Sequence, residues 1–175
     1  FMIAEVARLL KQNKIKLPFG LYITNSVQEE VGLRGAQMIV ETIQPNVAIV
    51  TDVTHDTNTP MLNKIKQGDI KCGEGPVIYY GPAVQNNLLD LIISTAEKNK
   101  IPFQRGAASR ATGTDTDAFA FANGGVASAL VSLPLRYMHT TVESVSIKDV
   151  ESVILLIYNI LQKIKSLDYI LLLCV

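Results

Sequence analysis

The sequence has little cysteine, little histidine, no excess of either charge and no long apolar run. Lysine and arginine together number 16, as do aspartate and glutamate, so bulk charge gives no reason to expect nucleic acid or an anionic membrane as a partner. No apolar stretch reaches the roughly 18 to 20 residues that cross a bilayer. Cys72 and Cys174 lie too far apart for a metal-ligand pair. This argues against a secreted disulfide framework and predicts free thiols in the reducing cytoplasm.

Apolar residues make up 48% of the 175 residues, enough for one domain with a sizeable core. Short apolar runs of strand length alternate with segments of helical spacing. We predict strands at 21–26, 47–50, 77–80, 102–104 and 126–133, and helices at 1–14, 35–42, 85–98 and 146–165. This alternation is typical of an α/β fold, here a three-layer αβα sandwich whose sheet is mixed but mostly parallel.

Three local patterns complete this outline. The segment 53–75 is a long polar loop. Ser146 and Asp149 have the spacing of a capping box, which predicts that both side chains bond the start of the last helix. The tail 168–175 is apolar, and we predict that it is a final buried strand or an oligomer contact.

The chain opens as if in the middle of an element. Helical apolar spacing begins at Phe1, yet no initiator methionine stands at position 1 and no capping side chain precedes the apolar stripe. We hypothesise that further residues precede this segment in a longer protein. A coding sequence that starts at Phe1 or Met2 would contradict the hypothesis.

Polar side chains follow three of the predicted strands. Glu29 and Glu30 come after the strand at 21–26, Asp52 after that at 47–50, and His139 after that at 126–133. Loops at the carboxyl ends of strands form the ligand sites of α/β sheets, so we expect these side chains to converge. Buried carboxylates need a partner or a metal, and this set without cysteine suits zinc, cobalt or manganese.

Each of these residues also has a simpler interpretation when it is taken alone. Glu29 and Glu30 read as solvated loop residues, Asp52 as the start of a turn, and His139 as a structural histidine. His55, in a polar loop close to Asp52, reads as a bystander or as an outer-shell partner. If the segment around Glu29 is extended, its two carboxylates point in different directions.

Two glycine-containing segments are less informative by themselves. The segment 73–76 lacks the lysine of a phosphate loop and the setting of a dinucleotide fingerprint, so we predict a tight turn. The segment 113–117 alternates Asp and Thr, but it lacks the Gly and Glu that a calcium loop requires at later positions.

Five segments together resemble the motifs of the tetrahedral (TET) or deblocking metallo-aminopeptidases, a glutamyl-aminopeptidase-like family related to the dinuclear zinc exopeptidases. They occur in the order of that family at 27–36, 52–54, 73–78, 113–115 and 134–139, and they cover roughly residues 20 to 145. Members of this family have often been labelled cellulases or endoglucanases.

The resemblance implies a role for each residue. Glu29 matches the general base, Glu30 and His139 match ligands of one metal, and Asp52 matches a ligand of the second metal. Asp115 is assigned only a weak substrate-side role. The implied reaction uses two divalent ions, zinc or cobalt, to activate a water that removes N-terminal residues from peptides.

The resemblance is incomplete, because the family needs two more ligands and a dimerisation domain that this sequence lacks. It therefore implies that residues 1–175 are the C-terminal portion of a single catalytic domain, in a homo-oligomer that is often a dodecamer. A catalytically silent assembly or binding homologue is the alternative. A glycoside hydrolase with Glu29 and Glu30 as paired acids is disfavoured, because adjacent residues rarely give the required separation of roughly 5 to 9.5 Å.

Overall fold

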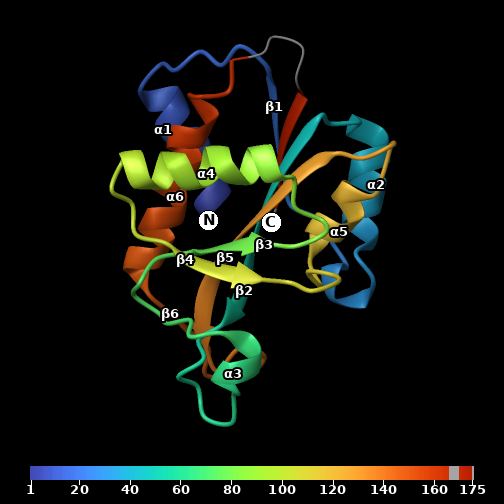
Figure 1. Ribbon diagram of the computed structural model, residues 1–175. Coiled ribbons are helices and arrows are strands. Elements are labelled where there is room, and N and C mark those ends of the chain that lie inside the picture. The colour runs from blue at the N-terminus through green and yellow to red at the C-terminus, as the bar shows by residue number, and fades with distance from the viewer. Residues whose placement is uncertain (166–169, 175) are drawn as a thin grey trace.

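A central sheet organises the chain, and helices cover both of its faces (Figure 1). The computed structural model describes residues 1–165 and 170–174. Within these residues the sheet has seven strands in the order β1-β7-β2-β5-β3-β4, with β6 paired to β5. The strands are β1 (Gly20–Thr24), β2 (Val47–His55), β3 (Val77–Tyr80), β4 (Gln104–Ala107), β5 (Ala127–Arg136), β6 (Ser144–Val145) and β7 (Ile170–Cys174).

The sheet is mixed and mostly parallel, as predicted. β1, β7, β2 and β5 run parallel, and β3 pairs with β4 in parallel but with β5 antiparallel. β2 is longer than the predicted run, because β5 stays in register beside it from Val47 opposite Ala127 to His55 opposite Leu135. Asp52 therefore lies within β2 rather than after it, opposite Ser132.

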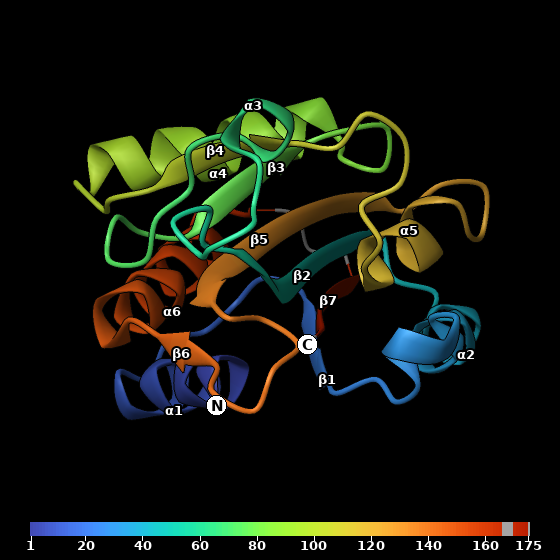
Figure 2. The same ribbon diagram turned by 90° about the horizontal axis from the view of Figure 1, so that it is seen from below.

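The helices form two layers, which confirms the three-layer sandwich. They are α1 (Met2–Gln12), α2 (Arg34–Ile43), α3 (Lys64–Gln67), α4 (Asn86–Lys98), α5 (Asp115–Ala120) and α6 (Ile147–Leu161), with a 3₁₀ turn η1 (Glu29–Val31). Figure 2 shows α1, α4 and α6 on one side of the sheet and α2 and α5 on the other. Ile49 packs on the first side and its neighbour Val50 on the second, since strand side chains alternate between faces.

The short helix α5 was not predicted from the sequence. Its segment has too few apolar residues for a clear helical period, and its motif reads as a loop. Thr114 caps the helix, because its side chain accepts a hydrogen bond from the Thr116 amide. Phe119 then anchors the helix in the core beside Val40 of α2 and Leu130 of β5.

The start of α6 corrects the predicted capping box. Within the described residues the Ser146 side chain makes no capping bond. The Asp149 carboxylate is fully buried and instead accepts hydrogen bonds from the amides of Gly73 (2.7 Å) and Gly75 (2.8 Å). The carboxylate thus holds a distant loop, which takes the tight turn predicted for 73–76 with positive φ angles at both glycines.

The strands predicted near the two ends of the chain have different outcomes. The strand predicted at 21–26 forms as β1, but it ends at Thr24, is bonded to β7 on one side and leaves Tyr22 and Ile23 exposed. The tail does form a buried strand, since β7 lies between β1 and β2 with Leu173 and Cys174 buried. Residues 168, 169 and 175 of that prediction lie outside the described residues.

The helices also bear on whether the chain could cross a membrane. Among residues 1–165 and 170–174, no helix combines the length and the apolar character needed to cross a bilayer.

Candidate active site

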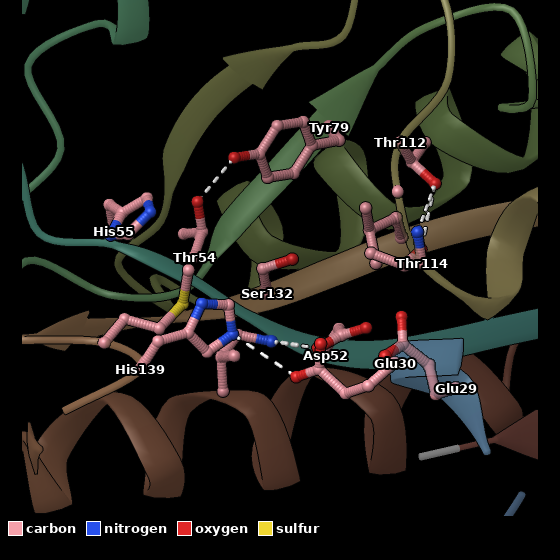
Figure 3. Close-up of a pocket in the computed structure, with 14 residues that line it drawn as sticks. Glu29, Glu30, Asp52, Thr54, His55, Tyr79, Thr112, Thr114, Ser132 and His139 are labelled. Atoms are coloured by element: carbon pink, nitrogen blue, oxygen red, sulfur yellow. Dashed lines mark hydrogen bonds and ion pairs between the residues drawn. The ribbon is translucent and has the colours of Figure 1, made fainter. Parts of the chain in front are cut away.

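Four of the five predicted site residues meet at one pocket, beside the carboxyl ends of β2 and β5 (Figure 3). The pocket has a volume of about 250 Å³. Glu29, Glu30, Asp52 and His139 all line it, so the predicted convergence is confirmed. The pocket lies just beyond the last pair of β2 with β7, Val50 opposite Cys174, and toward the carboxyl end of β2, where ligand sites form in α/β folds.

Glu29 and Glu30 lie on the turn η1, and the expected extended conformation is wrong. Gln28 and Gly32 flank the turn with φ angles of 60° and 113°. A 3₁₀ turn separates successive side chains by about a third of a turn, so the two carboxylates still diverge. Glu29 is half-buried and Glu30 is exposed.

Gly35 allows the chain to fold back next to this turn. Its amide donates to the Val27 carbonyl at 2.9 Å. A Cβ at position 35 would lie 2.4 Å from that same oxygen, closer than real carbon atoms approach. The segment before Glu29 therefore packs directly on the first turn of α2. This close approach requires glycine at position 35, and it sets where the turn begins.

His139 faces Glu30 across the pocket. Its Nε2 lies 3.3 Å from Oε1 of Glu30, as Figure 3 shows. His139 has a φ of 65°, and its amide donates to the Glu143 carboxylate at 2.6 Å. The two side chains are 64% and 75% exposed, so this ion pair by itself adds little to stability. The geometry brings together the two residues predicted to share one metal.

Negative charge accumulates on the other side of the pocket. Burial raises the pKa of Asp52, and the charges of Asp115 and Glu30 raise it further, although a bond from the Val53 amide opposes this. Burial also raises the pKa of Glu29, with added repulsion from Asp52, Asp115 and Glu30. Carboxylates that disfavour one another's charge are suited to a bound cation.

Asp115 is the most deeply buried of these carboxylates, with 1% of its surface exposed. It lies behind the pocket wall, to which Gly113 and Thr114 of the same segment contribute. The Ser26 hydroxyl donates to its Oδ2, and the Cys174 thiol lies 3.6 Å from the same atom. Its Oδ1 has no hydrogen-bond partner among the described residues.

These residues fit part of a metal site. The unpaired buried oxygen of Asp115 and the repulsion between Asp52 and Glu29 both favour a nearby cation, and oxygen and nitrogen donors suit zinc or cobalt. However, no three histidine, cysteine, aspartate or glutamate side chains in the described part of the chain stand close enough to form a ready metal centre. Complete metal coordination therefore needs side-chain movement or further ligands.

The opposite wall of the pocket carries hydroxyl groups that sequence reasoning missed. The Thr54 and Tyr79 hydroxyls lie 2.7 Å apart, and those of Thr112 and Thr114 lie 2.9 Å apart (Figure 3). Ser132 adds a buried hydroxyl that has no partner within the described residues. The register of β2 with β5 could have indicated Ser132, because it lies opposite Asp52, but that register is not readable from one sequence.

His55 lines the same pocket, at the end of β2. Burial lowers its pKa, and the charge of His139 lowers it further, which favours the neutral imidazole. The sequence interpretation of His55 as a bystander or an outer-shell partner stays a prediction.

The comparisons with known proteins agree on one family. The family model described as M42 glutamyl aminopeptidase matches residues 1–156. A lysyl aminopeptidase from Pyrococcus furiosus is 36% identical over 169 residues, which cover 97% of this chain and 47% of that protein. The chain thus spans less than half the length of this relative.

Two solved structures share the fold. A TET aminopeptidase from a marine sediment archaeon of the Thaumarchaeota matches with a TM-score of 0.80 and 29% identity, covering 91% of this chain and 45% of that one. The TET1 peptidase of Pyrococcus horikoshii matches with a TM-score of 0.61 and 29% identity, covering 79% of this chain and 40% of that one.

Proposed function

Because the chain belongs to the M42 glutamyl aminopeptidase family, we propose that it forms part of the catalytic domain of a metal-dependent aminopeptidase. This enzyme would remove N-terminal residues from peptides. The observation that carries the proposal is the convergence of Glu29, Glu30, Asp52 and His139 on one pocket, from three separate parts of the chain. The named relatives, a lysyl aminopeptidase and a TET aminopeptidase, support the same reaction class.

Each side chain has a proposed task. Glu30 and His139 would hold one divalent ion, zinc or cobalt, and Asp52 would hold a second. When bound, such ions polarise the scissile carbonyl and acidify a water molecule. Glu29 would take a proton from that water and pass it to the leaving amine. Its raised pKa suits this task, because a general base works best when its pKa lies near the working pH.

The remaining ligands are proposed to lie outside this segment. We retain the prediction that residues 1–175 are the C-terminal portion of the catalytic domain. A second hollow of about 250 Å³ lies on the other side of Glu29 and Asp52, and Met2 at the start of α1 lines it. A segment that leads into α1 could reach both carboxylates through this hollow.

The proposed assembly is a homo-oligomer in the cytoplasm. The TET1 peptidase of Pyrococcus horikoshii assembles into a tetrahedron or a large octahedral shell. This supports the prediction of a self-associating protein, with a dodecamer as the expected form. Peptides are the proposed substrates.

The experiment that tests the proposal uses the protein expressed from its complete coding sequence, called the full-length protein below. Bound metal is measured by elemental analysis, and hydrolysis of aminoacyl p-nitroanilides is followed with and without a chelator. We expect bound divalent metal and activity that the chelator removes. A protein with neither would support a silent homologue, and hydrolysis of β-glucan without peptidase activity would support the glycoside hydrolase.

A further inference from the structure

We propose that Asp115 is a positioning residue, which fixes the turn carrying Glu29 and Glu30 by accepting the Ser26 hydroxyl hydrogen bond. The Ser26–Asp115 bond joins residues 89 positions apart in the chain. It connects the N-terminal end of α5 to the segment between β1 and η1. The kinetic part of this inference rests on the proposed function, whereas the structural part does not.

A role at the protein surface does not explain why Asp115 is buried. A carboxyl group with 1% exposure loses its hydration, and one of the Asp115 oxygens has no partner within the described residues. An acidic residue in the first turn of a helix is favourable, but an exposed carboxylate would provide that benefit without the cost of burial. The burial therefore needs a further reason, and the bond from Ser26 offers one.

Ser26 stands three residues before Glu29, on the segment between β1 and η1. β1 ends at Thr24, and the residues from 25 to 28 belong to no helix or strand. The backbone amides of residues 33 to 35 donate to carbonyls of this segment and its turn, so α2 holds the far side. The Ser26 bond to Asp115 holds the near side.

The Ser26–Asp115 pair also contacts an inner strand of the sheet. The Cys174 thiol lies 3.6 Å from Asp115 Oδ2 and 3.7 Å from the Ser26 oxygen. Cys174 belongs to β7, whose neighbours are β1 and β2, and β2 carries Asp52. Asp115 therefore ties the Glu29 turn to the same strands that position Asp52, which keeps the two carboxylates in a fixed relation.

Asp115 lies close to the pocket without lining it. Its neighbours Gly113 and Thr114 form part of the pocket wall, and Asp115 does not. In this inference Asp115 acts through Ser26. The weak substrate-side role that the resemblance implies for it stays a prediction.

The test is Ser26→Ala, which removes the donor and leaves the buried carboxylate in place. Amide hydrogen exchange of the metal-free full-length protein measures the mobility of the turn directly. We expect the amides of Leu33 and Gly35 to exchange at least about fivefold faster, because the turn opens more often. Ser26→Thr should restore the wild-type rates, because threonine keeps the hydroxyl donor.

The matched control is Ser152→Ala. Ser152 is a buried serine on α6 whose hydroxyl donates to the Lys148 carbonyl, remote from the pocket. It should leave the exchange at Leu33 and Gly35 unchanged. Asp115→Ala combined with Ser26→Ala should speed exchange by less than the two single changes multiplied together, because both single changes remove the bond that joins these residues.

Kinetics separates the failure of this inference from the failure of the proposed function. On an aminoacyl p-nitroanilide, Ser26→Ala should lower kcat about tenfold and leave KM within about twofold, since the general base is misplaced while the binding walls remain. Unchanged exchange at Leu33 and Gly35 in Ser26→Ala would overturn the inference. An inactive wild-type protein would overturn the proposed function, and the exchange result would still decide the role of Asp115.

Discussion

Glu29 and Glu30 are adjacent residues with different surroundings. Glu29 is half-buried among other carboxylates that raise its pKa, whereas Glu30 is exposed and faces His139 at 3.3 Å. A single turn of 3₁₀ helix is enough to separate them. The difference supports a proton-transfer role for one residue and a metal-binding role for the other.

We expect Glu29→Gln to lower kcat by about 10²- to 10⁴-fold and to leave the bound metal in place, because the amide keeps the shape but cannot accept a proton. Turnover and elemental analysis of the full-length protein measure both effects. Glu41→Gln, an exposed glutamate on α2, is the control and should behave as wild type. Full activity in Glu29→Gln would refute the base assignment.

Glu30 and His139, which face each other, should instead affect the amount of bound metal. Glu30→Ala and His139→Ala should each reduce bound metal by about half or more, since each removes a ligand from the same proposed ion. Metal content after dialysis against a defined free zinc concentration is the measurement. Wild-type metal content in both variants would show that the ion is bound elsewhere.

Cys72 gives a prediction that depends on pH. Burial raises its pKa to about 11, and the negative charge of Asp56 adds to the effect. A higher pKa means less thiolate at any pH below it, so at pH 8.5 the thiolate is about a hundredfold scarcer than for an ordinary thiol. Alkylation by iodoacetamide, followed by peptide mass spectrometry, should therefore be slow. Asp56→Asn should speed it, and reaction at the rate of a free thiol would contradict the prediction.

At the scale of secondary structure elements, the loop 73–75 and α6 are joined by Asp149. Both carboxylate oxygens are used, one for each glycine amide. We expect Asp149→Asn to lower the free energy of unfolding by about 2–3 kcal/mol, because an amide offers one acceptor and turns a donor toward a buried N–H group. Urea denaturation measures the loss. Asp90→Asn, on an exposed position of α4, should change stability by less than about 0.5 kcal/mol.

Two glycines in this loop provide a matched pair. Both have φ angles near +90°, but a Cβ at Gly75 would lie 2.3 Å from the Pro102 carbonyl oxygen, whereas one at Gly73 would meet only a distant Ser146 hydroxyl. Gly73→Ala should cost about 1–2 kcal/mol from backbone strain alone. Gly75→Ala should cost about 1–3 kcal/mol more, because the backbone must also move. Equal losses in thermal or urea unfolding would contradict the steric argument.

The sequence predicted most elements, and the misses have physical causes. The apolar run at 77–80 matches β3, because buried strands leave a continuous apolar signal. β2 was cut short after Val50, because its later residues are polar and are held by pairing with β5. Helix α5 was missed because a single anchor, Phe119, secures it rather than a periodic stripe.

The same reasoning explains which site residues were found. Glu29, Glu30, Asp52 and His139 follow or end apolar strand signals, and local sequence shows this. Ser26 and Ser132 acquire their positions from contacts with residues far away in the chain. Such contacts depend on tertiary packing, and local sequence patterns carry little information about it.

At the scale of the whole molecule, the proposed metal site predicts a link between bound metal and stability. We expect zinc or cobalt to raise the unfolding temperature of the full-length protein by several degrees, because a ligand that binds only the folded state stabilises it by mass action. Differential scanning calorimetry with and without a chelator measures the shift. Asp52→Ala should show a smaller shift, and an equal shift would place the ion elsewhere.

The position of β7 has a consequence for biosynthesis. Strand β1 pairs in parallel with β7, and Thr24 bonds to Leu173, which is 149 residues further along the chain. During translation, β1 therefore has to wait until residues 170–174 have left the ribosome before it gains this pairing. The turn with Glu29 and Glu30 follows β1, so a nascent chain stalled before residue 170 carries both glutamates without the β1–β7 pairing that positions their turn.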